Sequence, residues 1–435
     1  MIIQELILEN FRGYKEIKIP LHDRFNLIIG DNGSGKTAIL EALTVAMGSL
    51  FLGIRDTDSR HILSKDIHIN TFEDSEEFGW PVSVSAKGIV NNKEISWKRE
   101  LTSFKSKTLA RGAMPIKKIG SEYDQSIRNN EKIILPVLAY YATGRLFDEA
   151  RDVKEKESKN PQIASRLRAY NQCLKAKMTF KQFIKWFRGK ELAKIQKGTS
   201  DINYSVVKNA IISNIPDCSN IYFEFDPDKP KGLKVVFNDG RILPFSYLSD
   251  GTRNFFALIA DIAYKCVTLN PHLKENALIE ASGIVLIDEL DLHLHPDWQR
   301  KIIVGLKTTF PKVQFITSTH SPFLIQETES NQLIKLKNNS IISISQANNL
   351  SIEDIAEEFQ EVENPQWSKS RQYMFEVASK YYKAVKEGKD TPQMKNELDM
   401  AMKPFAQDTA LYAVIEQEKI KAEYKQSQNK NETRK

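Results

Sequence analysis

Cysteine is scarce in this sequence, and so are long apolar runs. The three cysteines, Cys173, Cys218 and Cys266, are odd in number and far apart among 435 residues. They provide neither a disulfide framework nor a paired metal site, and they favour a reducing compartment. No stretch approaches the roughly 18 consecutive apolar residues of a spanning helix. Glu5 and Glu9 interrupt the N-terminus where a secretory peptide would be apolar. We therefore expect a cytoplasmic protein that does not associate with membranes.

Neither sign of charge dominates the whole chain. It has 62 Lys and Arg residues against 56 Asp and Glu residues, a formal net charge of +6. A net charge this small says little about nucleic-acid binding, and the places where charges cluster matter more. The length exceeds one ordinary domain of roughly 100–200 residues. We expect an α/β head over residues 1–345, with a basic helical insertion at about 146–215, and a helical region over 346–435.

A glycine-rich turn follows the buried strand that residues 24–30 predict. Residues 30–37 read GDNGSGKT and fit the pattern G-x-x-x-x-G-K-[ST], and a helix-like pattern follows at 36–50. Strand, turn and helix in this order wrap backbone N–H groups around a polyphosphate. Lys36 adds a charge for the β- and γ-phosphates, and Thr37 offers a hydroxyl to Mg²⁺. The residues that we expect to bind the nucleotide here are Gly30, Asn32, Gly33, Ser34, Gly35, Lys36 and Thr37.

Two carboxylates end a second apolar run. Residues 283–287 read GIVLI, and Asp288 and Glu289 follow at the carboxyl end of this predicted strand. Sites in open α/β sheets form at that end of the strands. We expect Asp288 to hold Mg²⁺ and Glu289 to orient the attacking water as general base. In isolation such a pair is usually only solvated, so this interpretation depends on the phosphate loop upstream.

A serine and a glycine stand at the start of another predicted helix. Residues 248–253 read LSDGTR and follow a predicted hairpin at 233–245. Ser249 can cap the helix, which is a purely structural role. A helix start with these residue types is also an anion site. Both interpretations stay open on the residues alone.

Taken in order, these motifs resemble those of the ABC-type ATPase heads, in the branch that includes the SMC, Rad50, RecF and OLD-like proteins. The Asn-Phe-Arg segment at 10–12 is similar to the opening of that branch, in which the arginine, here Arg12, contacts the nucleotide. The resemblance implies a mixed central sheet with an antiparallel β lobe, and ATP and Mg²⁺ as cofactors. It also implies that two heads pair, with Ser249 and Gly251 of one copy closing over the γ-phosphate of ATP held by the other.

The resemblance assigns further residues after the carboxylate pair. Asp291 matches the D-loop, and His320, in the Ser-Thr-His segment after a predicted strand at 313–319, matches the residue that contacts the γ-phosphate or the attacking water. His293 and His295 belong to a run that is usual and structural in this branch, so we expect no metal there. The glutamine that should follow the lobe-linking strand, predicted at 132–141, is missing. Arg145 stands near that place, and of its two interpretations, a phosphate sensor and a surface loop cation, we favour the second.

Basic residues gather in two segments. Lys and Arg outnumber Asp and Glu between residues 145 and 200, where residues 179–189 predict a helix that ends at Gly189. Residues 101–120 contain no acidic residue, and their candidate cations are Lys105, Lys107, Arg111, Lys117 and Lys118. These segments can bind DNA, another nucleic acid or a protein, or they can be solvated faces with aromatic residues in the core.

The layout of the whole chain is similar to phage-defence ATPases of the Septu type, including versions that work beside a retron, which pair with an HNH endonuclease. The resemblance implies a homodimer or higher oligomer, with a nuclease subunit docked on helices at 350–425. No Asp-x-Asp cluster follows Pro322, so we expect no intrinsic nuclease. The alternative is an ATP-gated DNA-repair clamp without a toxic partner. A transporter ATPase is a third option, which the Asn-Phe-Arg opening and the basic insertion argue against.

Overall fold

The computed structural model describes residues 1–144, 166–175, 180–342 and 347–432. The chain forms two compact units, residues 1–350 and residues 351–435. Each unit is described by itself below. Arg145 and residues 146–165 of the expected insertion lie outside the described residues.

A six-stranded mixed sheet forms the centre of the first unit, in the order β15-β14-β3-β13-β12-β8. Its strands are β3 (Phe25–Gly30), β8 (Val137–Tyr141), β12 (Gly283–Ile287), β13 (Val313–Ser318), β14 (Leu333–Lys337) and β15 (Ser340–Ile342). Only β15 pairs antiparallel with its neighbour within this sheet. The carboxyl ends of β3, β12 and β13 therefore meet at one edge of the sheet, which is where ligand sites form in such folds.

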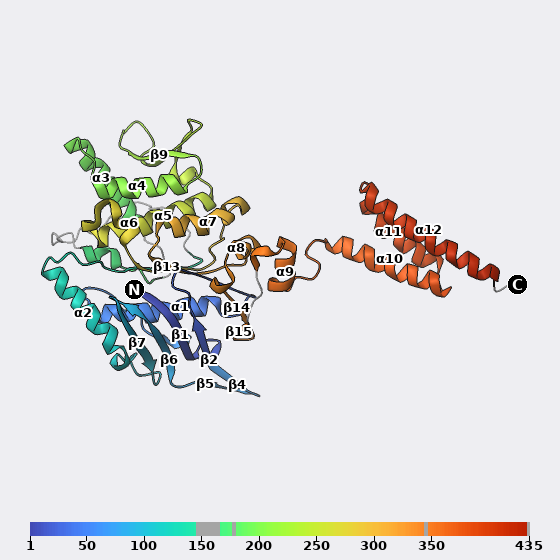
Figure 1. The fold of residues 1–435 in the computed structure, drawn as a ribbon, viewed down its shortest axis with the longest axis horizontal. Helices are drawn as coiled ribbons and strands as arrows, with labels where there is room; N and C mark the ends of the chain where they lie inside the picture. Colours follow the sequence, from blue (N-terminus) through green and yellow to red (C-terminus); the bar gives the residue numbers. More distant parts are fainter. Residues whose placement is uncertain (145–165, 176–179, 343–346, 433–435) are drawn as a thin grey trace. The chain divides into compact units, whose positions relative to one another are not determined.

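Helices cover both faces of this sheet. One face carries α1 (Lys36–Gly48), and the other carries α5 (Asp250–Leu269) and α7 (Pro296–Thr309) (Figure 1). The short helices α6 (Ala277–Glu280) and α8 (Pro322–Gln326) complete this layer. Strands that are covered on both sides are continuous apolar runs, and all residues of β12 are indeed buried.

Helix α1 is the most apolar helix of the core. The segment 36–53 is long and apolar enough to cross a membrane by length and composition alone, but 78% of it is buried inside the protein. It lies between the central sheet and an antiparallel sheet, and the indole N–H of Trp97 donates a 3.0 Å hydrogen bond to the carbonyl oxygen of Ala46. Burial between two sheets explains its hydrophobicity without a bilayer.

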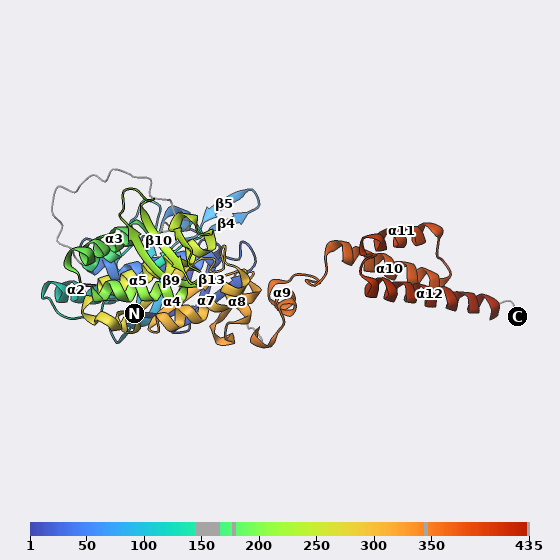
Figure 2. The ribbon, with the colours of Figure 1, turned by 90° about the horizontal axis from the view of Figure 1, so that it is seen from above.

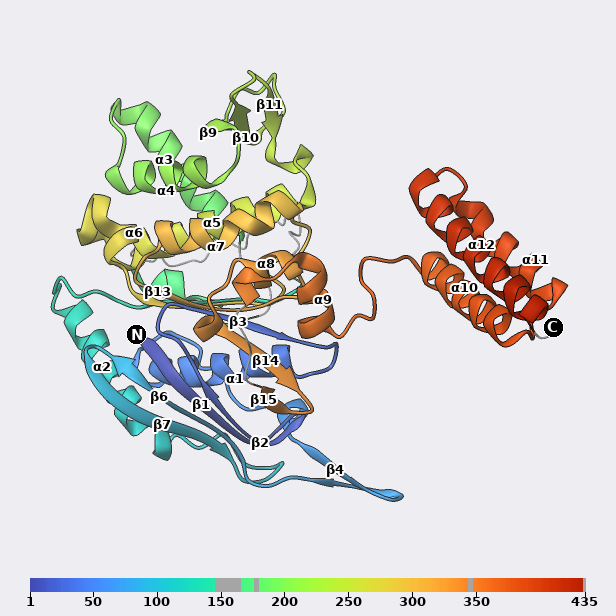
Figure 3. The same ribbon diagram turned by 45° about the vertical axis from the view of Figure 1, so that its right-hand side comes forward.

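The antiparallel lobe confirms the expected second sheet. Its order is β2-β1-β6-β7, and its strands are β1 (Ile2–Phe11), β2 (Tyr14–Pro20), β6 (Val82–Val90) and β7 (Lys93–Leu101). Asn91 and Asn92 both have positive φ, 50° and 57°, as the tight hairpin turn between β6 and β7 requires. Helix α2 (Met114–Arg128) follows the lobe in the chain. The hairpin of β4 (Ile69–Phe72) and β5 (Ser75–Phe78) projects from the lobe (Figures 2 and 3).

Helices occupy the described part of the expected insertion. They are α3 (Phe180–Lys197) and α4 (Ile202–Asn214), and a small sheet of β9 (Cys218–Glu224), β10 (Gly232–Phe237) and β11 (Ile242–Pro244) follows. The expectation that the first helix ends at Gly189 is wrong, because α3 continues to Lys197. The residues after Gly189 are good helix formers, and Gly198, with φ of 68°, stands just past the helix end instead.

Strand β8 is shorter than the strand predicted at 132–141, since it begins only at Val137. Pro136 lacks the N–H that a ladder needs. The backbone before it is satisfied differently, because the amide of Leu135 donates to Oδ1 of Asn270 at 2.7 Å.

The second unit contains only helices among its described residues. They are α9 (Ile352–Gln360), α10 (Lys369–Glu387), α11 (Pro392–Met402) and α12 (Thr409–Glu432). Helices α10, α11 and α12 share a small core that includes Met374, Tyr381, Leu398 and Ile415. Helices α10, α11 and α12 therefore form a bundle with its own apolar interior.

Candidate nucleotide site

The glycine-rich loop at 30–37 connects β3 to α1, and Tyr14 of β2 supports it. The Tyr14 hydroxyl donates a 2.8 Å hydrogen bond to the carbonyl oxygen of Ser34. Gly35 has φ of +93°, and a Cβ at this position would lie 2.3 Å from the Tyr14 hydroxyl oxygen. Glycine is therefore needed at position 35 for both backbone conformation and space. The loop pattern alone gives no signal for Tyr14.

The side chain of Lys36 turns back toward the start of the glycine-rich loop. Its Nζ donates to the carbonyl oxygens of Gly30 and Asp31 at 2.7 and 2.9 Å. Only 7% of the residue is exposed. Burial lowers the pKa of the Lys36 ammonium, and the carboxylate of Asp288 is the strongest charge that acts in the opposite direction. The lysine of the loop and the acidic residue after β12 thus lie within electrostatic reach of each other.

Asp288 accepts hydrogen bonds from two hydroxyl groups. Oγ1 of Thr37 donates to Oδ2 at 2.9 Å, and Oγ of Ser318 donates to Oδ1 at 2.5 Å. These bonds connect α1, the end of β12 and the end of β13. Sequence reasoning did not assign a role to Ser318. Its place at the end of the predicted strand at 313–319, in the Ser-Thr-His segment, was the signal available.

Glu289 stands on a turn with an unusual backbone conformation. Its φ is 51°, a region that residues other than glycine rarely adopt. Ser318 fixes the turn, because its hydroxyl accepts from the amide of Glu289 and its carbonyl oxygen accepts from the amide of Leu290, both at 2.8 Å. Strained backbone that the surroundings fix in this way is a feature of functional sites.

Asp291 and His320 lie on neighbouring loops. Oγ1 of Thr319 donates to Oδ1 of Asp291 at 2.5 Å, so the loop after β13 is bonded to the loop after β12. His320 follows directly and is exposed. The carboxylates of Glu289 and Asp291 also act on the pKa of Lys36, in the direction opposite to burial. The structure thus brings the acidic residues after β12 around the lysine of the loop.

Ser249 and Gly251 lie at the start of α5. Ser249 is exposed and caps the helix, since its hydroxyl accepts from the amide of Thr252 at 3.3 Å. A Cβ on Gly251 would lie 2.1 Å from the carbonyl oxygen of His293. The start of α5 therefore packs directly on the loop that contains Asp291. Among the described residues, no hydrogen bond or ion pair connects Ser249 or Gly251 to residues 30–37 of the same chain.

Arg12 lies in an ion cluster between the antiparallel lobe and α1. Its Nη2 is 2.5 Å from Oε2 of Glu41, and its Nε donates to Oδ1 of Asp66 at 3.0 Å. Arg60 contacts the same two carboxylates, at 3.2 and 3.4 Å. In this structure the Arg12 guanidinium joins the lobe to the second turn of α1. Within the described part of the chain, no hydrogen bond connects it to residues 30–37.

His295 caps a helix. Its Nδ1 accepts a 3.3 Å hydrogen bond from the amide of Asp297, in the first turn of α7. Among the described residues no group of three or more His, Cys, Asp or Glu side chains is arranged to hold a metal ion. The Thr37 hydroxyl and the Asp288 carboxylate instead form the kind of oxygen pair that suits Mg²⁺, which keeps several of its waters.

The loop also has unused capacity for a polyphosphate. Oγ of Ser34 is buried and has no hydrogen-bond partner among the described residues. A buried hydroxyl without a partner costs about 1–3 kcal/mol. With the N-terminus of α1, Lys36 and the Thr37–Asp288 pair beside it, this loop fits a nucleotide with a divalent cation.

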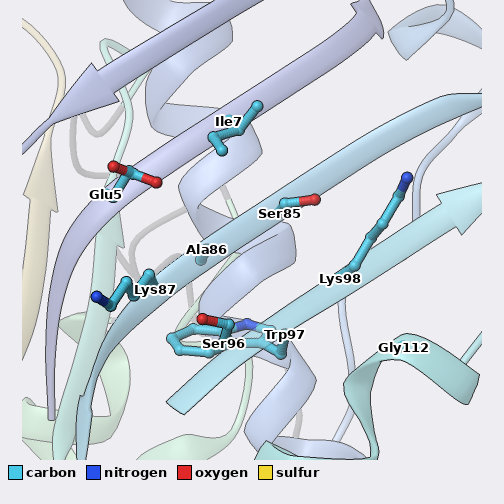
Figure 4. Close-up of a pocket in the computed structure, with 9 residues that line it drawn as sticks. All are labelled: Glu5, Ile7, Ser85, Ala86, Lys87, Ser96, Trp97, Lys98 and Gly112. Atoms are coloured by element: carbon cyan, nitrogen blue, oxygen red, sulfur yellow. The ribbon is translucent and has the colours of Figure 1, made fainter. Parts of the chain in front are cut away.

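A separate cavity of about 270 Å³ lies on the antiparallel lobe (Figure 4). Its lining comes from β1, β6, β7 and Gly112, and it includes the charged residues Glu5, Lys87 and Lys98. It contains none of the candidate site residues. The cavity and the phosphate loop are therefore different places on this unit.

Known proteins are similar to this chain in sequence or in fold. The chain is 28% identical to "Retron Ec83 probable ATPase" of Escherichia coli, over 77% of this chain and 71% of the relative. It is 26% identical to "Septu protein PtuA" of Bacillus thuringiensis, over 77% of this chain and 76% of the relative. A solved SMC head bound to the C-terminal winged-helix domain of ScpA is 17% identical, with a TM-score of 0.47, over 79% of this chain and 98% of the solved one.

A family model matches residues 25–326, which is most of the first unit and more than half of the chain. This match spans the phosphate loop, the start of α5, the carboxylate pair and the Ser-Thr-His segment. The chain belongs to that family of ATPases, described as "AAA domain, putative AbiEii toxin, Type IV TA system".

Proposed function

We propose that this chain binds ATP with Mg²⁺ at residues 30–37 and hydrolyses it to ADP and phosphate. The observation that carries the proposal is the 2.9 Å hydrogen bond between Thr37 and Asp288, beside the buried ammonium of Lys36. Mg²⁺ bound at that pair would neutralise charge on the β- and γ-phosphates. The family match and the names of the relatives support this proposal.

Each acidic residue after β12 has its own role in this proposal. Asp288 would hold the metal together with Thr37, and Glu289 would accept a proton from the attacking water. The turn that Ser318 fixes holds Glu289 at the carboxyl edge of the sheet. Asp291 is bonded to Thr319 and so holds the loop after β13. This loop would bring His320 beside the γ-phosphate.

Hydrolysis requires two copies in this proposal. Ser249 is exposed at the N-terminus of α5, where backbone N–H groups attract anions. The start of α5 in one copy would close over the γ-phosphate held by the other. Because Gly251 packs on the carbonyl of His293, a shift of the loop around Asp291 would reach the start of α5 through backbone contact. ATP would then control whether two heads are joined.

We place this ATPase in a defence system of the retron or Septu type, in the cytoplasm. The names of two relatives support that assignment. A separate nuclease of the HNH type would dock on the helices of the second unit. Exposed apolar side chains there provide surface for a partner. They are Tyr373, Met400, Val414, Ile420 and Tyr424.

The second candidate function is an ATP-gated clamp on DNA. Lys181, Lys185 and Arg188 are exposed at spacings that place them along one face of α3. The neighbouring Phe183 and Phe187 are fully buried, so they fill the core of the insertion and do not stack on bases. In the segment 101–120, Lys105, Lys107, Arg111 and Lys118 are exposed and Lys117 is half-buried. Phosphate binding by these cations predicts a steep loss of DNA affinity with salt.

Two experiments test the proposal and separate its parts. Purified protein should release phosphate from ATP, and Lys36→Ala should abolish both that release and nucleotide binding. Loss of release with full binding in this variant would contradict the role given to Lys36.

Co-expression with a neighbouring HNH protein should yield a complex that a chain ending at Leu350 no longer forms. If no complex forms while ATP is hydrolysed and DNA affinity falls steeply with salt, the clamp is the better description.

A further inference from the structure

Tyr140 carries a buried hydroxyl that nothing in the described chain satisfies. It is the fourth residue of β8, it is 4% exposed, and its hydroxyl has no hydrogen-bond partner among the described residues. Tyr141 differs, because its hydroxyl donates to Oδ2 of Asp261 at 2.7 Å. Buried polar groups are nearly always bonded, so an exception needs an explanation.

The register of the sheet places Tyr140 beside the candidate site. Tyr140 is paired with Leu286 and Tyr141 with Ile287 in the parallel ladder of β8 and β12. Side chains alternate along a strand, so Tyr140, Leu286 and Asp288 share one face of the sheet. The hydrogen bond of Asp288 to Thr37, at the start of α1, lies on that face. Tyr141 points to the opposite face, where it meets Asp261 of α5.

Electrostatics agree with this placement. Burial raises the pKa of Tyr140, and among the charges the carboxylate of Asp288 raises it most. The hydroxyl therefore stays protonated at neutral pH and is available as a donor. Asp288 already accepts from Thr37 on Oδ2 and from Ser318 on Oδ1. Glu41, the other nearby carboxylate, accepts from Arg12 and Arg60 on Oε2.

We propose that the Tyr140 hydroxyl donates a hydrogen bond to an oxygen of the bound Mg²⁺–triphosphate, either a γ-phosphate oxygen or a water on the metal. This inference rests on the proposed function and adds a substrate contact from β8. Asp288, just after β12, and Thr37 of α1 would hold the metal, and Tyr140 would add a contact from β8. Tyr140 thus offers a polar group on β8. This is the strand after which the resemblance predicts a glutamine that the sequence lacks.

Tyr140→Phe and Tyr141→Phe are a matched pair that tests the proposal. Each variant loses one hydroxyl from the same strand. Thermal unfolding and calorimetric titration with a non-hydrolysable ATP analogue, with and without Mg²⁺, are measured for both. Tyr140→Phe should melt at or above the wild-type temperature without nucleotide, because it loses only an unpaired hydroxyl. Its affinity for the Mg²⁺ complex of the analogue should fall about tenfold. Tyr141→Phe should melt lower, because it removes one of the two donors to the buried Asp261 carboxylate and leaves only Lys265, and should keep the wild-type affinity.

Wild-type affinity in Tyr140→Phe would overturn the assignment, as would an equal loss of affinity in both variants. A lower melting temperature of Tyr140→Phe with unchanged affinity would show a purely structural hydroxyl and also overturn it. Lys36→Ala separates this failure from that of the proposed function. If the wild type binds the analogue, Lys36→Ala does not, and Tyr140→Phe does so fully, only the Tyr140 assignment fails. If the wild type does not bind the analogue, both fail.

Discussion

Thr37 and Asp288 are 251 positions apart in the chain, and a 2.9 Å hydrogen bond joins their side chains. The bond connects the first turn of α1 to the end of β12. Ligand sites of open α/β sheets form at these strand ends, and side-chain oxygens of this kind suit Mg²⁺.

Asp288→Asn should remove the metal-dependent part of nucleotide binding. The amide keeps the size of the side chain but not the charge that attracts Mg²⁺. We expect the affinity for ATP with Mg²⁺ to fall at least about tenfold, since hydrogen bonds to charged groups are worth roughly 1.5–3 kcal/mol. The affinity in EDTA should stay at the wild-type value or rise. Titration of a fluorescent nucleotide measures both, and equal losses in the two buffers would contradict the metal role.

Glu289→Gln should stop turnover and keep binding. The amide cannot accept the proton of the attacking water, and general-base catalysis contributes about 10²–10⁴-fold. We expect the rate of phosphate release to fall by that range while ATP affinity stays within a few-fold of wild type. A normal rate in this variant would assign the general base to another residue.

Arg12→Ala should lower stability in the absence of nucleotide. Only 20% of the Arg12 side chain and none of the Asp66 side chain is exposed, and removal of Arg12 leaves buried carboxylate charge less compensated. We expect a loss of about 1–3 kcal/mol in the free energy of unfolding by urea. Lys18→Ala is the control, since Lys18 is 64% exposed in its ion pair with Glu5 and should change stability by less than about 0.5 kcal/mol. If Arg12→Ala unfolds like the wild type but binds ATP more weakly, Arg12 contacts the nucleotide as the resemblance implies.

Gly251→Ala should damage the protein where Gly189→Ala does not. A Cβ at position 251 meets the carbonyl oxygen of His293 at 2.1 Å, whereas nothing lies within 4 Å of a Cβ at 189. We expect Gly251→Ala to lower both the melting temperature and the ATPase rate. Gly189→Ala, inside α3, should stabilise by up to about 1 kcal/mol, since alanine is the better helix former. Unchanged activity in Gly251→Ala would show that the loop after β12 can shift freely.

Local patterns predicted the elements that hold the candidate site. The glycine loop, the 283–287 strand and the helix from Gly251 could be predicted because each combines an apolar run with a turn or cap residue. The ends of the helices and strands were harder to predict. Pro136 shortened β8, and α3 ran through Gly189, because glycine inside a helix only weakens it.

The contacts between motifs could not be predicted from local patterns. Ser318 bonds Asp288 because β13 and β12 are neighbours, and that order is a property of the whole sheet. Tyr14 supports Ser34 across two sheets, and no spacing in the sequence indicates this. Arg12 has a matching motif, but its partners Glu41 and Asp66 come from segments whose approach depends on the folded lobe.

The mass of Glu289→Gln in solution, measured by light scattering with ATP and Mg²⁺, tests most directly whether one triphosphate joins two copies. We expect the mass to double when ATP is added, and to stay that of one chain with ADP. Adding Ser249→Arg should return the ATP-bound protein to a single chain without loss of the first ATP-binding event, because the start of α5 acts only on the neighbouring copy. A Glu289→Gln protein that stays monomeric at saturating ATP, or a dimer that Ser249→Arg leaves intact, would contradict the shared site.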